Sequence, residues 1–352
     1  MAEPCKLIHK NIEEAYTYTG KANTIAVILD GSAVLGLGNI GPSAALPVME
    51  GKACLFKKFG GLNAVPIVID TNDIEEIIEF VKLIAPTFGG INLEDISSPR
   101  CIEIETRLKK ELNIPVFHDD QHGTAIVTIA ALINSLKLDN KSPEECNVVI
   151  SGVGAAGSSI IRMLNNFGVS DIFAFNSKGI LNRNEKYSNE LYNQLAMKTN
   201  RESLDLTLED AMKRADIFIG VSVPNKIDKK MVKSMKRDPI ILAMANPDPE
   251  ITYEDAKAAG ARVVGTGRSD YPNQVNNVLA FTGLFKGALK VRAPKITEKM
   301  KYAAAEAIAN LIKDNELCEE YVIPSVFDSG VADAVAYSVA KCAVEEQIST
   351  GH

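Results

Sequence analysis

Residues 148–157 read Val148-Val149-Ile150-Ser151-Gly152-Val153-Gly154-Ala155-Ala156-Gly157, which places G-x-G-x-x-G directly after an apolar, strand-like run. A helical run follows and ends near Phe167, and a second strand-like run, Asp171–Phe175, completes a βαβ unit. In such a unit the glycines permit a tight turn, close approach of the backbone to a pyrophosphate and close packing of helix on strand. We therefore expect dinucleotide binding, with cofactor contacts at Gly152, Gly154, Ala155, Ala156 and Gly157. The alternative is a generic tight turn from strand to helix.

Two pairs of acidic residues follow other strand-like runs in the first part of the chain. They are Glu94 with Asp95, and Asp119 with Asp120. The carboxyl ends of parallel strands meet at one edge of a sheet, so we expect the four carboxylates to converge there. Oxygen-only ligands favour Mg²⁺ or Mn²⁺ over zinc and leave positions open for a chelating substrate. In the simpler alternative, the first pair is a solvated turn and the second caps a helix that begins near Gly123.

Apolar runs alternate with amphipathic helical runs, which is the pattern of parallel sheets with crossover helices. We predict an α/β protein with an N-terminal α/β substrate and metal domain (1–122), a Rossmann-like parallel-sheet domain (123–292), and C-terminal helices that pack back on the domains (293–352). Further expected strands are Thr24–Leu29, Val65–Ile69, Gly90–Leu93, Val116–Phe117, Ile217–Gly220, Ile240–Met244 and Arg262–Gly265. Further expected helices are Ser43–Phe59, Asp73–Ala85, Pro99–Leu112, Thr124–Leu136, Thr297–Asp314 and Val331–Ile348.

The composition is ordinary for a soluble globular enzyme, with 46% hydrophobic and 24% charged residues over 352 positions. The net charge of −7 and the pI near 5.4 argue against a nucleic-acid partner. The sequence has neither an apolar stretch of about 18 residues nor a signal-peptide pattern, so we expect no membrane partner and a cytoplasmic location. Its six cysteines show no C-x-x-C spacing, which favours reduced thiols over disulfides or a metal cluster.

Several further stretches, in their order along nearly the whole chain, resemble the malic enzymes, specifically the small-subunit bacterial type. They are Asp30–Pro42, Met49–Ala53, Pro86–Asp95, Asp119–Asp120, Ala245–Pro249 and Gly267–Asn277. The resemblance implies oxidative decarboxylation of malate to pyruvate and CO₂. It also implies NAD or NADP as the cofactor, Mg²⁺ or Mn²⁺ as the cation, and a homodimer.

By resemblance, the metal ligands are Glu94, Asp95 and Asp120, while Lys52 is the catalytic base and Asp119 its partner. A cation chelated by the C2 oxygen and C1 carboxylate of malate would stabilise the enolate that decarboxylation leaves. Consecutive residues of a regular strand point to opposite faces. Glu94 and Asp95 can therefore share one ion only if the strand has ended or bulged there.

The sequence around Lys52 independently supports its role as the base. Lys52 lies three residues after Met49 and four before Phe56, on their side of the predicted helix, whereas Lys57 and Lys58 point elsewhere. A lysine desolvated among apolar neighbours has a lowered pKa, which an amine base requires. In the alternative, Lys52 packs its stem and reaches water with its charge.

Asn246 and Asn277 match family positions that contact substrate and nicotinamide, and uncharged amides can orient a carboxylate there. Asn276 could serve in place of Asn277, and either could simply bond to backbone in a turn. Larger animal-type members carry an arginine where this chain has Ala33. Arg268 or an amide is therefore expected to bind the carboxylate of malate.

Two histidines, His118 and His122, stand four residues apart, which on a helix is a spacing typical of zinc ligands. The flanking carboxylates and the resemblance favour structural or supporting roles for them. We leave both histidines out of the predicted metal site.

The choice between NAD and NADP stays open from the sequence. Dinucleotide sites commonly carry an acidic residue after the second strand, where it binds the ribose 2′-hydroxyl, but this chain has Asn176, followed by Ser177 and Lys178. A 2′-phosphate meets no repulsion there and Lys178 could attract it, so we expect NADP to be used alongside NAD. We assign these three residues, with Ser222 and Asn246, to the cofactor site.

Malic enzymes carry a catalytic tyrosine in a Tyr-Thr/Ser-Pro-Gly-Val-Ala-Glu-Pro-Cys segment, and this chain opens at Ala2-Glu3-Pro4-Cys5. The matching tyrosine would lie upstream of Met1, and Tyr16 and Tyr18 do not match it, so we expect the chain to lack this general acid. Two alternatives to an active malic enzyme follow. One is a catalytically impaired member that binds malate and dinucleotide, and the other is a malolactic or oxaloacetate-decarboxylating variant.

Overall fold

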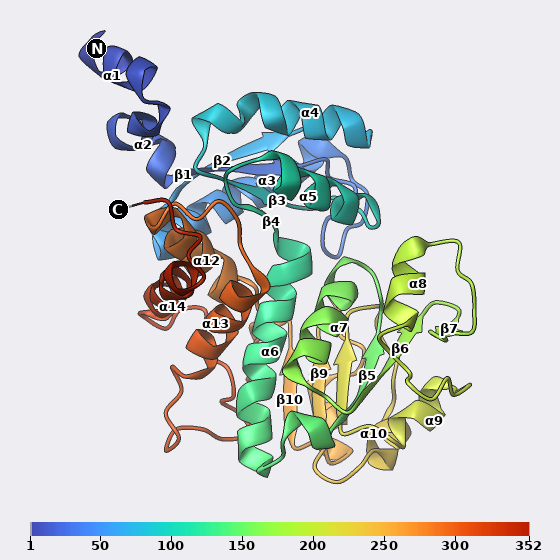
Figure 1. The fold of residues 1–352 in the computed structure, drawn as a ribbon. Coiled ribbons are helices and arrows are strands. Elements are labelled where there is room, and N and C mark those ends of the chain that lie inside the picture. The colour runs from blue at the N-terminus through green and yellow to red at the C-terminus, as the bar shows by residue number, and fades with distance from the viewer. Residues whose placement is uncertain (1, 352) are drawn as a thin grey trace. The chain divides into compact units, whose positions relative to one another are not determined.

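The computed structural model describes residues 2–351 as two compact units. Of these residues, unit 1 comprises 2–119, 278–307 and 329–351, and unit 2 comprises 120–277 and 308–328. Each unit contains its own β-sheet (Figure 1). The predicted α/β fold with a Rossmann-like parallel sheet is confirmed.

Unit 1 is built on a four-stranded parallel sheet of order β2-β1-β3-β4. Its strands are β1 (Thr24–Leu29), β2 (Asn63–Val68), β3 (Gly90–Leu93) and β4 (Val116–His118). The connecting helices are α3 (Pro42–Leu55), α4 (Ile74–Ile84) and α5 (Arg100–Glu111), and α3 continues into a π-helical turn (Phe56–Gly60). Before β1 lie the short helices α1 (Ala2–Lys10) and α2 (Ala15–Tyr18). The central strands β1 and β3 are almost wholly buried, as parallel strands normally are.

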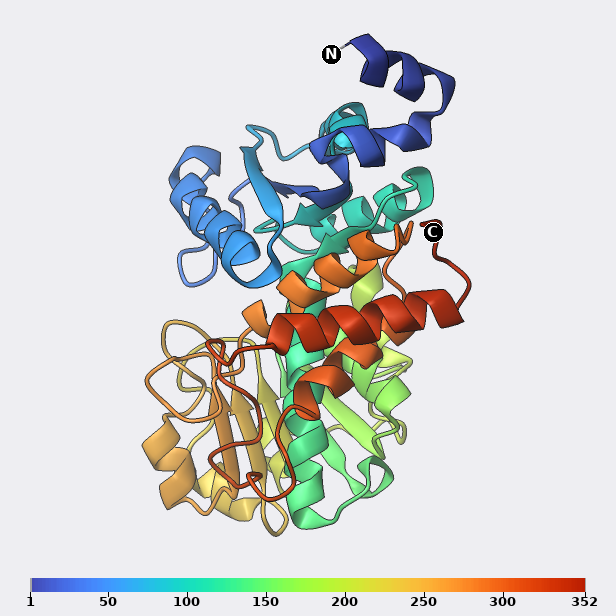
Figure 2. The same ribbon diagram turned by 90° about the vertical axis from the view of Figure 1, so that its left-hand side faces the viewer.

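Three helices from the C-terminal part of the chain complete unit 1: α12 (Val278–Lys290), α13 (Glu298–Ala309) and α14 (Val331–Glu345). Figure 2 shows α12 and α14 side by side, in orange and red. On α12, Phe281 and Phe285 contact Phe56, with ring centroids 4.6 and 5.8 Å apart. Phe285 also meets Phe117 of β4 at 5.9 Å. This aromatic cluster joins α12 to the end of α3 and to the sheet of unit 1.

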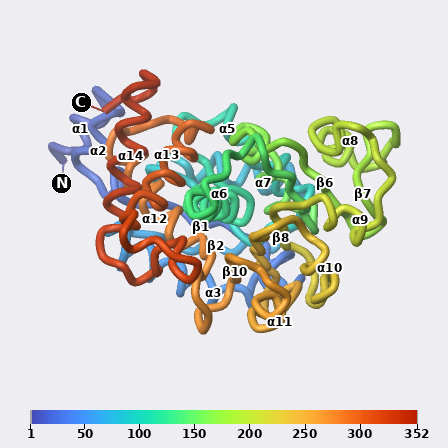
Figure 3. Tube along the Cα trace, turned by 90° about the horizontal axis from the view of Figure 1, so that it is seen from below, coloured from blue at the N-terminus to red at the C-terminus, as the bar shows by residue number. Residues whose placement is uncertain are grey.

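Unit 2 contains a six-stranded sheet of order β10-β9-β8-β5-β6-β7, parallel except for the edge strand β7. Its strands are β5 (Asn147–Ser151), β6 (Asp171–Asn176), β7 (Gly179–Ile180), β8 (Ile217–Gly220), β9 (Ile240–Ala243) and β10 (Val263–Thr266). Its helices are α6 (Asp119–Asp139), α7 (Ala155–Phe167), α8 (Glu190–Ala196), α9 (Leu208–Met212), α10 (Lys229–Ser234) and α11 (Tyr253–Ala258). Seen from below in Figure 3, β7 and α8 lie together beyond β6. The strand order reverses between β5 and β8, and in such sheets ligands bind outside the carboxyl ends of the strands at this point.

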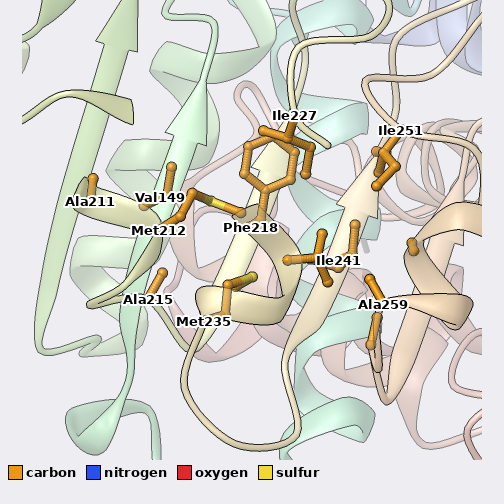
Figure 4. Packing of buried hydrophobic residues seen from close by; sticks show 14 of the residues in the cluster. Val149, Ala211, Met212, Ala215, Phe218, Ile227, Met235, Ile241, Ile251 and Ala259 are labelled. Atoms are coloured by element: carbon orange, nitrogen blue, oxygen red, sulfur yellow. The ribbon is translucent and has the colours of Figure 1, made fainter. Parts of the chain in front are cut away.

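A hydrophobic cluster covers one face of the unit 2 sheet (Figure 4). Val149, Phe218 and Ile241 come from the neighbouring strands β5, β8 and β9, and their register places them next to one another. Met212 and Met235 pack on them from the connections. All five side chains are buried. This packing fixes the three strands whose carboxyl ends form the expected ligand edge.

Two predicted helix boundaries are wrong, and α8 to α12 were not predicted, of which α12 is the longest. The helix expected from Thr124 begins at Asp119, because aspartates in the first turn interact favourably with the positive end of the helix dipole. The helix expected to end at Asp314 ends at Ala309. Ten of the 13 residues of α12 are buried, so its sequence lacks the one-sided pattern that marks an amphipathic helix.

The two units divide the chain differently from the predicted domain ranges. The predicted range 123–292 includes α12, whereas α12 packs within unit 1 on α14 and on the π-helical turn. Residues 308–328, predicted as part of the C-terminal helices, group with unit 2. Among the described residues, none of the helices has the length and apolar character that crossing a membrane requires.

Candidate active site

Lys52 projects from α3 into a buried group of acidic residues in unit 1. Only 7% of Lys52 is exposed, and Met49 and Phe56 on the same side of the helix are buried with it. The Lys52 Nζ donates hydrogen bonds to Oε2 of Glu94 at 2.6 Å and to Oδ2 of Asp119 at 2.5 Å. It also lies 4.2 Å from the ring centroid of Phe281 on α12. Lys52 is therefore anchored inside the protein and does not reach out to water.

Two carboxyl groups meet the Lys52 Nζ, and the one on Asp119 has a strongly perturbed pKa. Burial raises the pKa of Asp119 to about 7, with Glu94 adding to the rise and Lys52 opposing it. A carboxyl that titrates near neutral pH can take a proton from Lys52 and leave the amine free to act as a base.

Glu94, Asp95 and Asp120 form an acidic group that could hold a metal ion, since one carboxylate oxygen from each lies within 4.8 Å of the others. Strand β3 ends at Leu93, and Asp95 has φ 48°, so the two consecutive acids do not follow regular strand geometry. The Glu94 N–H still donates to the Ile28 carbonyl of β1 at 2.9 Å. Asp120 directly follows Asp119 on the first turn of α6. The condition for Glu94 and Asp95 to share one ion is met.

The donor set fits a hard divalent cation. Four carboxyl groups, those of Glu94, Asp95, Asp119 and Asp120, accompany the single ammonium of Lys52, and all but Asp120 are buried. Like charges so close together in a buried place repel one another unless a cation offsets them. Oxygen donors alone are the ligands that Mg²⁺ and Mn²⁺ prefer.

Asn92 is a member of this site that the sequence analysis did not single out. Its Nδ2 donates to Oε2 of Glu94 at 2.8 Å, the same oxygen that accepts from Lys52. Asn92 is fully buried, and its Oδ1 makes no hydrogen bond. Two donors on Oε2 fix the rotation of the Glu94 carboxylate and direct its other oxygen elsewhere. A lone amide inside the otherwise apolar strand β3 was the available sequence signal.

Arg100 ties together the loops that follow the first three strands. Its guanidinium pairs with Asp30 at 2.8 Å and donates to the Asn72 carbonyl at 3.0 Å. It also donates to the hydroxyls of Ser32 and Ser97 at 2.8 and 3.0 Å. These contacts hold the segment that carries Glu94 and Asp95 from the solvent side.

Neither histidine belongs to the acidic group. His118 ends β4 whereas His122 lies on α6, so the two do not share one helical face. His118 is fully buried, and burial lowers the pKa of its ring. Its backbone N–H donates to Glu105 at 3.0 Å, while the His122 Nδ1 lies 2.9 Å from the Ser159 hydroxyl. Both contacts are structural in kind.

In unit 2 the glycine-rich turn connects β5 to the N-terminus of α7. Gly152 has φ 102°, and a Cβ there would lie 2.5 Å from the Val221 carbonyl oxygen. A Cβ at Gly157 would lie 1.9 Å from the Gly152 carbonyl oxygen, so the helix packs against the turn itself. A Cβ at Gly154, by contrast, would meet nothing within 4 Å. The first and last glycines are required by the protein, and the middle one leaves the backbone open to a ligand.

The remaining predicted cofactor residues lie at the same edge of the unit 2 sheet. Asn176 ends β6, and its Oδ1 accepts the backbone N–H groups of Lys178 at 2.7 Å and Gly179 at 3.0 Å, while Ser177 and Lys178 are exposed. The Ser222 hydroxyl lies 2.9 Å from that of Ser151, between the ends of β8 and β5. The Asn176 Oδ1 thus stabilises the turn, and its Nδ2 is the atom that could donate a hydrogen bond to a ligand.

The predicted substrate residues in unit 2 occupy loops. Asn246 follows β9, and Asn276 and Asn277 directly precede α12. Arg268 forms a forked ion pair with Asp270, at 2.9 and 2.7 Å. That pair occupies the Nε and Nη2 edge of the Arg268 guanidinium.

Two sequence profiles of one protein family match the chain. The profile described as malic enzyme, N-terminal domain, matches residues 1–109, and the profile described as malic enzyme, NAD binding domain, matches residues 121–344. The chain belongs to the malic enzyme family. Lys52, Glu94 and Asp95 fall within the first match and the glycine-rich turn within the second, while Asp119 and Asp120 lie between the two.

Individual malic enzymes are similar over nearly the whole chain. The bifunctional malic/malolactic enzyme of Bacillus subtilis (strain 168) is 59% identical over 350 residues, covering 99% of this chain and 85% of that one. The NAD-dependent malic enzyme of Geobacillus stearothermophilus is 54% identical over 343 residues, covering 97% and 72%. The crystal structure of a malic enzyme from Pyrococcus horikoshii Ot3 matches with a TM-score of 0.95 and 46% identity, covering 100% of this chain and 83% of that one.

Replacing Asn92 by leucine should weaken Mn²⁺ binding by about 10–100-fold, because the Glu94 carboxylate loses a donor that fixes its rotation. The dissociation constant for Mn²⁺ can be measured by titration calorimetry without any turnover. Asn63→Leu, at an exposed position of β2 in the same unit, is the matched control and should leave Mn²⁺ affinity unchanged. Equal affinities for Asn92→Leu and the wild type would show that Asn92 does not orient Glu94.

Proposed function

We propose that this member of the malic enzyme family oxidises and decarboxylates malate to pyruvate and CO₂, with reduction of a nicotinamide dinucleotide and dependence on a divalent cation. The observation that carries the proposal is the buried Lys52 bonded to both Glu94 and Asp119 beside a three-carboxylate group. This arrangement supplies a base, a proton acceptor for that base, and oxygen ligands in one place. The family membership of the chain supports the same reaction.

In the proposed mechanism, Lys52 in its amine form takes the proton of the malate C2 hydroxyl, and a bound nicotinamide dinucleotide would accept the C2 hydride. Asp119 prepares Lys52 by holding its proton, which a buried carboxyl with a pKa near 7 can do. In the resulting 2-oxo acid, the bond between C3 and C4 breaks, CO₂ leaves, and the electron pair moves to the C2 oxygen as an enolate. Lys52 then returns the proton it took to C3, the C2 carbonyl re-forms, and the product is pyruvate.

Glu94, Asp95 and Asp120 would hold a Mg²⁺ or Mn²⁺ ion. An ion held by these residues would supply Lewis-acid chemistry that stabilises negative charge on the substrate. Asn92 and Lys52 keep one Glu94 oxygen engaged, so the carboxylate meets the ion with a fixed orientation. Phe281 covers Lys52 and keeps water from competing for its amine.

A malolactic reaction is the second candidate, because one similar relative is named for both malic and malolactic activities. Such a reaction would use the same residues and would return the hydride to pyruvate before release, giving lactate. The two candidates differ in net redox change. A homodimer and a cytoplasmic location stay predictions.

Product analysis should therefore distinguish the candidates. With malate, Mn²⁺ and NAD or NADP, the protein should form pyruvate and reduced dinucleotide in equal amounts, because each oxidation releases one hydride. Chromatography of the acids and absorbance of the reduced cofactor measure both. Lactate without accumulation of reduced cofactor would support the malolactic reaction instead. Binding of Mn²⁺ and dinucleotide without turnover would contradict both and would support the impaired member.

We further propose that both NAD and NADP are used, since Asn176 and the exposed Lys178 present no carboxylate to a 2′-phosphate. Asn176→Asp should raise the ratio of kcat/KM for NAD over NADP by about tenfold. The new carboxylate can keep the turn with one oxygen, while the other binds a free 2′-hydroxyl and repels a phosphate. Asn184→Asp, at an exposed position of the same unit, adds the same charge and should change the ratio little. An unchanged ratio in Asn176→Asp would show that this position does not face the ribose.

A further inference from the structure

Glu250 is a fully buried carboxylate in unit 2. It belongs neither to the glycine-rich turn nor to the stretches that resemble the malic enzymes. Its Oε1 accepts the backbone N–H of Ser222 at 2.8 Å and the Ser222 hydroxyl at 3.4 Å. Its Oε2 accepts the backbone N–H of Ala245 at 3.1 Å. Ser222 follows β8 and Ala245 follows β9, so one side chain joins the carboxyl ends of two neighbouring strands.

The fold makes room for this carboxylate. A Cβ at Gly220, the last residue of β8, would lie 2.2 Å from the carboxyl carbon of Glu250. Backbone bonds hold the same two segments together nearby, since Asn225 N–H donates to the Pro249 carbonyl and Ile227 N–H to the Glu250 carbonyl, both at 3.2 Å. Glu250 is thus built into the contact between the segment after β8 and the segment after β9.

The contacts of Glu250 reach the glycine-rich turn through Ser222. The Ser222 hydroxyl lies 2.9 Å from the hydroxyl of Ser151, which ends β5 immediately before Gly152. β5 and β8 are the two strands between which the sheet order reverses, and this is where a dinucleotide binds in such sheets. Ser222 itself is exposed at that edge, although its backbone is held from beneath by a buried carboxylate.

We infer that Glu250 is a positioning residue for the dinucleotide, which fixes Ser222 and, through it, the end of β5 at the edge of the sheet where the cofactor binds. The inference rests on the proposed dinucleotide site and deepens it. Glu250 acts through the protein and touches no reacting atom. Its role is to hold Ser222 and the end of β5 in the conformation that binds the cofactor, in the absence of the cofactor.

The choice of a carboxylate is explained by the donors that surround it. Burial raises the pKa of Glu250, while the N–H groups of Ser222 and Ala245 oppose that rise by hydrogen bonding to the charged form. A glutamine of the same shape has one acceptor oxygen, so its amide nitrogen would face one of the two backbone donors. Buried donors left without an acceptor are costly, and the segment would shift to find one.

The test is a binding titration of the full chain with NADH and with NADPH in the absence of malate. The fluorescence of the reduced cofactor reports binding. Glu250→Gln should raise the dissociation constant by about tenfold, because a small misplacement of binding groups weakens contacts that depend on geometry. Mn²⁺ affinity, which depends on Glu94, Asp95 and Asp120, should not change. Glu254→Gln, an exposed glutamate on α11, is the matched control and should bind like the wild type.

The outcomes separate positioning from simple stabilisation. A lower melting temperature for Glu250→Gln with unchanged dinucleotide affinity would overturn the inference, because the residue would then act on stability alone. Should Glu250→Gln fail to fold, Ser151→Ala removes only the buried hydroxyl that Ser222 contacts. It should weaken dinucleotide binding severalfold, and wild-type affinity in Ser151→Ala would contradict the link. Lack of dinucleotide binding by the wild type would instead overturn the proposed dinucleotide site.

Discussion

The buried contact of the Lys52 ammonium with the carboxyl groups of Glu94 and Asp119 is the interaction on which the rest of the site depends. A buried lysine is tolerable only if carboxylates meet it, and these two come from different elements, the end of β3 and the start of α6. Their meeting requires β3 to end at Leu93 and α6 to begin at Asp119. It also requires α12 to close over the lysine with Phe281. The contacts of Lys52 therefore depend on where β3 ends and α6 begins.

Both units place buried polar groups at the carboxyl ends of parallel strands. In unit 1, Asn92 fixes Glu94 and Arg100 fixes the loops beside it. In unit 2, Glu250 fixes the segments after β8 and β9. The buried apolar strands are rigid. Each polar group is anchored at the end of such a strand, and its hydrogen bonds fix the side chain or backbone group that would contact a ligand. Proposed catalysis and cofactor binding then depend on supports that do not touch the substrate.

The sequence predicted those parts of the fold and site that local patterns encode. The glycine-rich turn, the two acidic pairs and the buried side of Lys52 each depend on residues close together in the chain, so spacing alone was informative. Helix α12 was missed because it is apolar on all sides, and the start of α6 was placed late because its first turn is acidic. Asn92 and Glu250 were missed as supports because their roles arise from contacts that only the folded chain creates, and Glu250 acts on a residue 28 positions away.

The central claim is that Lys52 transfers the substrate proton, and replacing it by arginine tests this most directly. Arginine keeps the positive charge beside Glu94 and Asp119 but cannot lose its proton in the working pH range. The account predicts that kcat for malate oxidation in Lys52→Arg falls by about 10²–10⁴-fold, the usual contribution of a positioned base. Dinucleotide affinity should stay at the wild-type value, and Lys57→Arg, on the exposed side, should retain full activity. A wild-type kcat in Lys52→Arg would contradict the account, because the charge alone would then be sufficient.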